Sequence, residues 1–109
     1  MLAFENRLKK QKDFEKVFKD GVGFKQGSLY LKIGKNGLQS TRFGFVVSKK
    51  FSKKAVDRNR VKRILREVIK SNLSNIKSGL DVVVVVNPGT KIDSEELNKS
   101  MIVLFKKIK

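Results

Sequence analysis

The sequence predicts one α+β domain, residues 1–109, in which helices pack on a central sheet in two layers. Residues 28–33 and 41–48 alternate apolar and polar side chains, as half-buried strands do. Residues 80–87 are almost entirely β-branched, which is typical of a strand buried on both faces. Three further stretches repeat apolar residues at helical spacing, near 12–20, 57–72 and 93–108. The expected order is helix, two or three strands, helix, strand, helix.

The first helix is expected near residues 12–20. Phe14, Val17 and Phe18 recur at the i, i+3, i+4 spacing that places them on one face. Gly21 then suits the helix end, because glycine adopts the left-handed conformation without steric cost.

Two strands should follow the first helix. In the first, Leu29, Leu31 and Ile33 share one face, and Tyr30 and Lys32 share the other. The sequence Gly-Lys-Asn-Gly predicts a turn at 34–37. The second strand places alternate apolar residues on one face, namely Phe43, Phe45 and Val47. Leu38 and Gln39 either open this strand early or form a separate short strand.

The second helix carries a continuous apolar stripe, formed by Val61, Ile64, Leu65, Val68 and Ile69. Asp57 is the expected N-cap, because its carboxylate can accept from the first unpaired amides. After the buried strand, Asp93 and Glu96 resemble a capping box for a last helix. A buried strand that is reached through a helix favours at least one parallel pair.

Composition restricts the possible functions. Lys and Arg total 26 against 10 acids, giving a net charge of +16, and the chain has no Cys and no His. Disulfides, Cys/His zinc sites and histidine-based catalysis are therefore excluded. The first residues lack the apolar stretch of a signal peptide, so a cytoplasmic location is expected. Such a charge favours a polyanion as partner, with nucleic acid first and anionic membrane second.

The positive charge is concentrated in residues 49–70, which contain ten basic residues and two acids. On a helical wheel, five basic side chains gather opposite the apolar stripe, and Arg60 lies toward a flank: Arg58, Lys62, Arg63, Arg66 and Lys70. A solvated helix face normally mixes both signs, so this one-signed face favours phosphate binding. A DNA-reading helix remains an alternative at this point.

Aromatic residues give a second indication. Phe14 and Phe18, with Tyr30 on the polar side of a strand, would provide a stacking surface for unpaired bases. The alternative, which the spacing alone favours, is that both phenylalanines belong to the core.

Three segments together resemble the family of protein subunits of bacterial ribonuclease P: RLKKQKDFEKVFKDG (7–21), FGFVVSKK (43–50) and AVDRNRVKRILRE (55–67). The resemblance runs from about Arg7 to Pro88, and its most specific part is Ser-Lys-Lys followed by Arg-Asn-Arg-x-Lys-Arg. It implies a ribosomal S5 domain 2-like fold, a mixed sheet with a left-handed βαβ crossover. The general rule for crossovers would predict the opposite hand.

The resemblance also implies a function. The ribonucleoprotein removes the 5′ leader of precursor tRNA, its RNA subunit is catalytic and needs Mg²⁺, and the protein itself holds no metal or cofactor. The implied partners are the catalytic RNA, as a 1:1 heterodimer, and precursor tRNA, with no DNA and no membrane. We expect contacts to the catalytic RNA from Arg58, Asn59, Arg60, Lys62, Arg63, Arg66, Lys49, Lys50, Lys53 and Lys54. We expect leader contacts from Phe14, Phe18, Tyr30, Lys32, Val46, Ser48, Val86 and Arg7.

Two positions depart from the family pattern. The loop before the helix usually carries Gly-Asn, whereas here it reads Phe51-Ser52-Lys53-Lys54, and Asn87 stands where the family often has a basic residue. Two alternatives to the family function are a small basic ribosomal or other structural RNA-binding protein and an independent nuclease. The second is disfavoured because metal-dependent nucleases cluster acids on a metal, whereas Glu95 and Glu96 suit helix capping.

Overall fold

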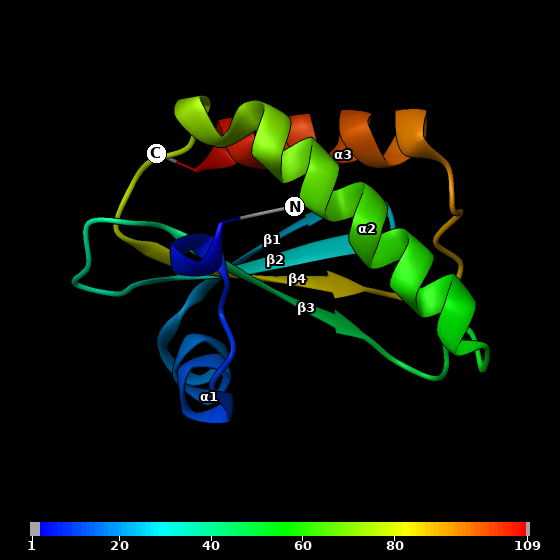
Figure 1. Ribbon diagram of the computed structural model, residues 1–109, viewed down its shortest axis with the longest axis horizontal. Helices are drawn as coiled ribbons and strands as arrows, with labels where there is room; N and C mark the ends of the chain where they lie inside the picture. The colour runs from blue at the N-terminus through cyan, green and yellow to red at the C-terminus, as the bar shows by residue number, and fades with distance from the viewer. Residues whose placement is uncertain (1–2, 109) are drawn as a thin grey trace.

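The computed structural model describes residues 3–108, and these residues form a four-stranded sheet with helices on both of its faces (Figure 1). The elements in chain order are η1 (Phe4–Asn6), α1 (Gln11–Asp20), β1 (Val22–Gln26), β2 (Leu29–Lys35), β3 (Arg42–Val47), α2 (Ala55–Asn72), η2 (Leu73–Asn75), β4 (Leu80–Val86) and α3 (Ser94–Lys107). The expected α+β architecture with a mixed sheet is therefore confirmed.

The strands are ordered β1-β2-β4-β3 across the sheet. β1 and β2 form an antiparallel hairpin, β2 pairs antiparallel with β4, and β3 pairs parallel with β4. The last strand in the chain thus occupies a central position, and it is buried on both faces as its β-branched run predicts.

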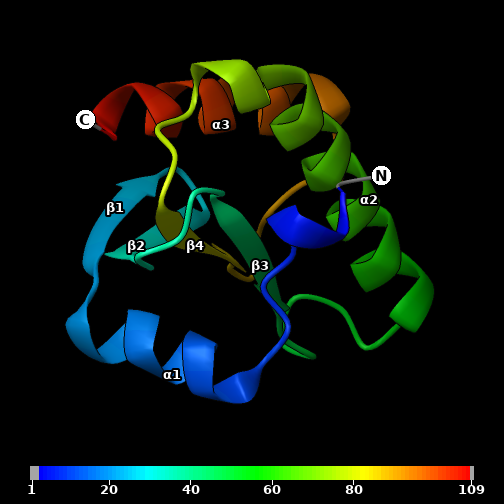
Figure 2. The same ribbon diagram turned by 60° about the vertical axis from the view of Figure 1, so that its left-hand side comes forward.

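The connection from β3 through α2 to β4 has the left-handed sense that the family resemblance implies. Figure 2 looks obliquely along β3 and β4 from behind, with α2 above the sheet and β4 to the left of β3. In Figure 1 the chain runs to the right along β3, back to the left through α2 above the sheet, and to the right again along β4, which lies behind β3; this anticlockwise turn recedes from the viewer and is therefore left-handed.

Each face of the sheet has its own apolar core. The larger core lies under α2 and α3 and contains Phe43, Leu31, Val84 and Met101 among its buried residues. The smaller core lies under α1, where Val17 and Leu8 pack against Val83. Figures 1 and 2 agree that α1 stands alone on its side of the sheet.

The strand β1 was not expected from the sequence. It contains Gly23 and follows Gly21, a pattern that reads as the end of a helix and a loop. Pairing with β2 makes it a strand, through a two-residue loop in which Gly27 has φ of 60°. A Gly-Ser pair between two strands is a recognised hairpin signal, so the sequence did contain an indication of β1.

Both expectations for Leu38 and Gln39 were wrong, because residues 37–40 form bends rather than a strand. The side chain of Asn36 accepts a hydrogen bond from the Leu38 amide at 2.7 Å and donates to the Ser40 carbonyl at 2.9 Å. These local bonds hold the segment in a turn, which is the usual effect of Asn beside glycine.

Asp57 is not the N-cap of α2. The helix begins two residues earlier, at Ala55, after Lys54, whose side chain makes no capping bond. Asp57 lies in the first turn, where a carboxylate favours the helix dipole, and it accepts from the Ser52 hydroxyl at 3.0 Å. The expected cap of α3 is confirmed, since Asp93 accepts from the amides of Glu95 and Glu96.

Candidate nucleic-acid interface

The basic face of α2 is held outward by the apolar stripe on the opposite side of the helix. Val61, Leu65 and Ile69 are fully buried against the sheet. We use "the basic face" for the outward residues Arg58, Asn59, Arg60, Lys62, Arg63, Arg66 and Lys70. Lys62, Arg66 and Arg58 are half-buried and the other four are exposed. A rigid helix thus presents the cations as a fixed row.

The loop before α2 is ordered by Ser52. Its carbonyl accepts from Arg58 Nη1 at 2.8 Å, and its hydroxyl donates to Asp57 and accepts from the Lys54 amide at 3.2 Å. Phe51 packs against the larger core. The segment Phe51-Ser52-Lys53-Lys54 is therefore a structured loop, and Arg58 has a structural contact as well as its place on the basic face.

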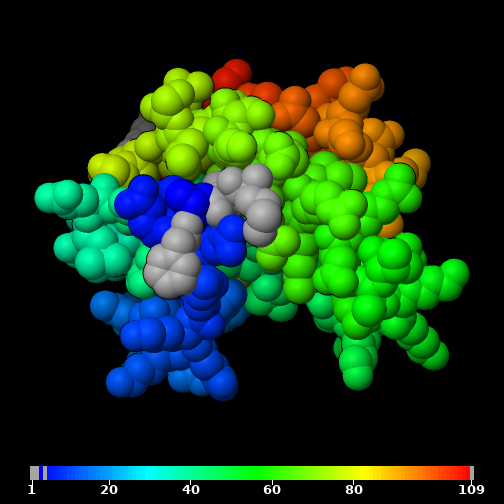
Figure 3. All heavy atoms as spheres, viewed as in Figure 1, coloured from blue at the N-terminus to red at the C-terminus, as the bar shows by residue number. Residues whose placement is uncertain are grey.

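The same loop leaves its lysines in solvent. Four of them are exposed and extend the basic face beyond the start of the helix: Lys49, Lys50, Lys53 and Lys54. Figure 3 shows green side chains of this part of the chain projecting from the lower right of the molecule. The predicted set of basic residues is thus gathered on one continuous surface.

A second surface lies on the opposite face of the sheet, beside α1. Val17 anchors α1 in the smaller core and is 3% exposed, whereas Phe14 is half-buried and Phe18 is 42% exposed. The core interpretation therefore holds in part for Phe14, which packs against the smaller core, but not for Phe18, which is largely at the surface.

The sheet beside α1 is open toward solvent in one row of side chains. Strand pairing aligns Lys25, Tyr30, Val85 and Val46 across the four strands. We call this row, together with Ser48 beyond it, the open face. Tyr30, Val85 and Val46 are half-buried, and Lys25 and Ser48 are exposed. Lys32 lies two residues from Tyr30 on the same side of β2.

The expectation for Val86 was wrong. Val86 pairs with Val47 and is 1% exposed in the larger core, so its side chain points toward α2 and α3. Val85 occupies the open face in its place, because alternate residues of a strand point to opposite sides. Lys25 and Val85 are thus residues of this surface that the sequence did not indicate.

Gly44 lets Phe14 approach the sheet closely. A Cβ built on Gly44 would overlap the Phe14 ring, with Cε1 at 2.6 Å. We expect Gly44→Ala to displace Phe14 and to lower the free energy of unfolding by about 1–3 kcal/mol, as overpacking does. Gly34→Ala is the control, since its nearest neighbour would lie at 4.0 Å. Urea unfolding measures both, and equal stability of the two variants would contradict the close approach.

An ion-pair network fixes α1 relative to the sheet. Arg42 on β3 donates from Nε and Nη2 to the Asp81 carboxylate at 2.8 and 2.7 Å, and its Nη1 lies 3.4 Å from Asp13 on α1. Asn36 Nδ2 also donates to Asp81, at 3.0 Å. The hydrogen bonds to Asp81 raise the pKa of Arg42 above its ordinary value, against the opposing effect of burial. Because Asp13 precedes Phe14, this network helps to set the position of the Phe14 ring.

Arg7 lies at the outer edge of β3 rather than on the open face. It forms an isolated parallel bridge with Phe43, and the next amide, that of Leu8, donates to the Phe43 carbonyl at 2.9 Å. The N-terminal segment thereby brings Arg7 near the basic face of α2.

The described residues contain no group of three or more Asp, Glu, His or Cys side chains placed to hold a metal ion. Within the same part of the chain, none of the helices has both the length and the apolar character needed to cross a membrane.

Comparison with known proteins places the chain in one family. The Ribonuclease P family model matches residues 2–109. The ribonuclease P protein component of Pseudanabaena sp. is 43% identical over 103 residues, which cover 93% of this chain and 89% of that protein. That of Dictyoglomus turgidum is 33% identical over 102 residues, covering 94% and 85%.

Solved structures agree in fold. The RNase P protein from Thermotoga maritima superposes with a TM-score of 0.86 at 31% identity, covering 94% of this chain and 97% of that one. The Staphylococcus aureus RNase P protein gives 0.85 at 29% identity, covering 94% of each chain.

Proposed function

Because the chain belongs to the ribonuclease P protein family, we propose that it contacts two RNAs at once through opposite faces of its sheet. The protein is a component of ribonuclease P, the ribonucleoprotein that removes the 5′ leader of precursor tRNA and in which the RNA subunit is the catalyst. It therefore works with the ribonuclease P RNA and with precursor tRNA. The protein's own contribution is to bind and position these molecules.

The catalytic RNA is assigned to the α2 side of the protein. The residues proposed to contact it are Arg58, Asn59, Arg60, Lys62, Arg63, Arg66, Lys49, Lys50, Lys53 and Lys54. The support is their gathering on one surface, largely exposed, on a rigid helix and an ordered loop. Arginine is suited to this task because its planar guanidinium makes paired hydrogen bonds to phosphate.

The single-stranded leader is assigned to the α1 side. The residues proposed to contact it are Phe14, Phe18, Tyr30, Lys32, Val46 and Ser48, with Val85 in place of Val86 and with Arg7 at the edge. Aromatic rings beside an open sheet face accept unpaired bases by stacking, and lysines nearby attract the phosphates. This preference for unpaired bases also favours RNA over duplex DNA.

One observation carries the proposal: the basic face and the open face lie on opposite sides of a single sheet. A protein with only a basic helix would bind one RNA and would provide no surface to bind the leader. Two separated surfaces let the protein hold the catalytic RNA and the substrate leader together.

The remaining features of the complex are also proposals. One basic face and one open face per chain suit a 1:1 complex with the RNA subunit, acting in the cytoplasm without membrane or DNA. We assign the required Mg²⁺ to the RNA, because Mg²⁺ prefers oxygen ligands and several carboxylates of the chain already make contacts within the protein. Asp57, Asp81 and Asp93, for example, each accept hydrogen bonds within the protein.

Reconstitution tests the function directly. Adding the purified chain to a bacterial ribonuclease P RNA at a Mg²⁺ concentration too low for the RNA alone should restore leader removal from precursor tRNA. A protein that only stabilises RNA structure would raise cleavage equally for substrates with long and with one-nucleotide leaders. A failure to increase cleavage at any Mg²⁺ concentration would refute the assignment.

Phe18 offers a test of the leader surface with little risk to folding, because it is 42% exposed. Phe18→Ala should weaken binding of leader-bearing precursor by about 5- to 100-fold, since stacking contributes roughly 1–3 kcal/mol per base. Binding of tRNA without a leader should not change. Val103→Ala on α3, at 38% exposure, is the matched control. Equal affinities of the two variants for leader-bearing precursor would show that Phe18 does not contact the leader.

A further inference from the structure

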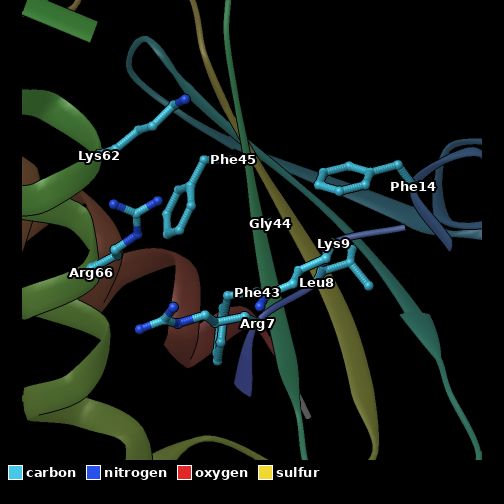
Figure 4. A pocket seen from close by; sticks show the side chains of 9 residues that line it. All are labelled: Arg7, Leu8, Lys9, Phe14, Phe43, Gly44, Phe45, Lys62 and Arg66. Atoms are coloured by element: carbon cyan, nitrogen blue, oxygen red, sulfur yellow. The ribbon is translucent and has the colours of Figure 1, made fainter. Parts of the chain in front are cut away.

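A pocket of about 360 Å³ lies at the outer edge of β3, where four segments of the chain meet. Figure 4 shows it from close by. The residues that matter for its chemistry are Arg7 from the N-terminal segment, Phe14 from α1, Gly44 and Phe45 from β3, and Lys62 and Arg66 from α2. We call it the β3-edge pocket. From the sequence, Phe45 was assigned only to one face of a strand, with Phe43 and Val47.

The pocket combines an aromatic surface with convergent cations. The guanidinium of Arg66 lies over the Phe45 ring, 5.4 Å from its centre. Figure 4 shows Lys62 and Arg66 reaching from α2 toward Phe45, and Arg7 extending beside Phe43 toward α2. Phe45 is half-buried, so part of the ring remains accessible from the pocket.

The charge of the β3-edge pocket has one sign. No carboxylate lines it. A neighbouring pocket of about 390 Å³ differs, because Glu5 and Asp13 stand there beside Arg42 and Lys10. Arg7 and Lys9 line both pockets, so the cations that distinguish the β3-edge pocket are Lys62 and Arg66. No carboxylate of the lining neutralises these two side chains, and an external anion would therefore be attracted to them.

We propose that the β3-edge pocket binds one unpaired nucleotide of RNA, with its phosphate against Lys62 and Arg66 and its base against Phe45. The volume falls at the lower end of the range for small-ligand pockets, which suits one nucleotide. A base within a duplex cannot enter such a recess, whereas an unpaired base can turn out and stack on an aromatic ring or a guanidinium. This inference rests on the proposed function, in which the chain binds RNA.

The position of the pocket leaves two sources for the nucleotide. Phe45 and Arg66 lie on the α2 side of the sheet, toward the proposed catalytic-RNA surface, and Phe14 lies on the α1 side, toward the leader. The chemistry is the same for a leader nucleotide and for a nucleotide of the catalytic RNA. The test therefore separates these two sources.

A direct test uses the isolated ¹⁵N-labelled protein and adenosine 5′-monophosphate as the probe. Saturable shifts are expected at the amides of Gly44 and Phe45 and at Nε–H of Arg66. Phe45→Leu keeps an apolar side chain but removes the ring, and it should weaken binding at least about fivefold. Phe105→Leu, a ring on α3 outside the pocket, should bind as the wild type does, and thermal melting checks that both variants fold.

Inorganic phosphate is the second probe. If phosphate binds as tightly as the nucleotide and Phe45→Leu changes neither, the pocket is only a patch of charge and the proposal is wrong. Absence of shifts at Gly44 and Phe45 would also overturn it.

The source is tested in the assembled holoenzyme with precursor tRNAs that carry one abasic nucleotide at successive leader positions. If the leader supplies the nucleotide, one abasic position weakens substrate binding in the wild type and has no further effect in Phe45→Leu. If the catalytic RNA supplies it, the leader scan is flat and Phe45→Leu weakens binding to the catalytic RNA alone. If both measurements are unchanged while the wild type still restores leader removal, this inference fails and the proposed function stands.

Discussion

The affinity of the protein for the catalytic RNA is expected to fall by about 10³–10⁵ between about 50 and 200 mM monovalent salt. Each phosphate that a lysine or arginine neutralises releases condensed counterions, and added salt opposes that release. The basic face and the four loop lysines suffice for roughly 6–10 such contacts. Filter-binding titrations at several salt concentrations measure the slope.

Single substitutions show which surface of the protein contributes to the salt dependence of binding. Arg63→Gln removes one exposed charge from the basic face and should lower the slope by about 1. Lys99→Gln removes one exposed charge from α3, on the side away from its buried residues, and should leave the slope unchanged. A salt-independent affinity would refute the electrostatic account. Equal slopes for the two variants would show that the RNA does not contact the basic face of α2.

Asp81→Ala is expected to lower the free energy of unfolding by about 3–5 kcal/mol, the usual effect of removing one partner of a buried ion pair. The Asp81 side chain is 7% exposed and holds both Arg42 and the Asn36 amide. Its removal leaves the Arg42 charge at the sheet with only the more distant Asp13 beside it. Chemical denaturation in urea measures the change.

Asp13→Ala provides the matched comparison, because the same arginine loses its more exposed partner instead. The Asp13 side chain is 27% exposed and 3.4 Å from Arg42, so the expected loss is below about 1 kcal/mol. Similar losses for both variants would show that the network acts through α1 rather than through the buried pair. Asp13→Ala should still reduce leader binding if the network positions Phe14.

Amphipathic spacing was sufficient to predict the three helices and, on α2, the buried face and the outward basic row. Val61, Leu65 and Ile69 are buried where the wheel places them, and the cations lie opposite. The buried stripe and the basic row both depend on the periodicity of a single helix, which can be read from one sequence. The hand of the crossover could not be predicted from residue spacing, and only the resemblance to the family implied it.

The error at Val86 has a physical cause. The segment 82–86 consists of five valines, so its composition is the same on both faces and does not reveal which residues face which helix. Only the register with β2 and β3, which places Val85 beside Tyr30, decides the orientation. The β3-edge pocket was equally beyond prediction, since Arg7, Phe45 and Arg66 meet only after the chain folds.

The central position of β4 has a consequence for how the chain acquires its structure. During synthesis, β1, β2 and β3 are made first, but β3 and the β1–β2 hairpin have no direct pairing and join only through β4. The sheet can close only after the valine segment has left the ribosome, which makes the contact order high and the folding slow for so small a domain. Until then the unfolded chain, with its high positive charge, is exposed to cellular RNA. Binding of RNA to the unfolded chain would compete with folding, although RNA is also the ligand of the folded protein.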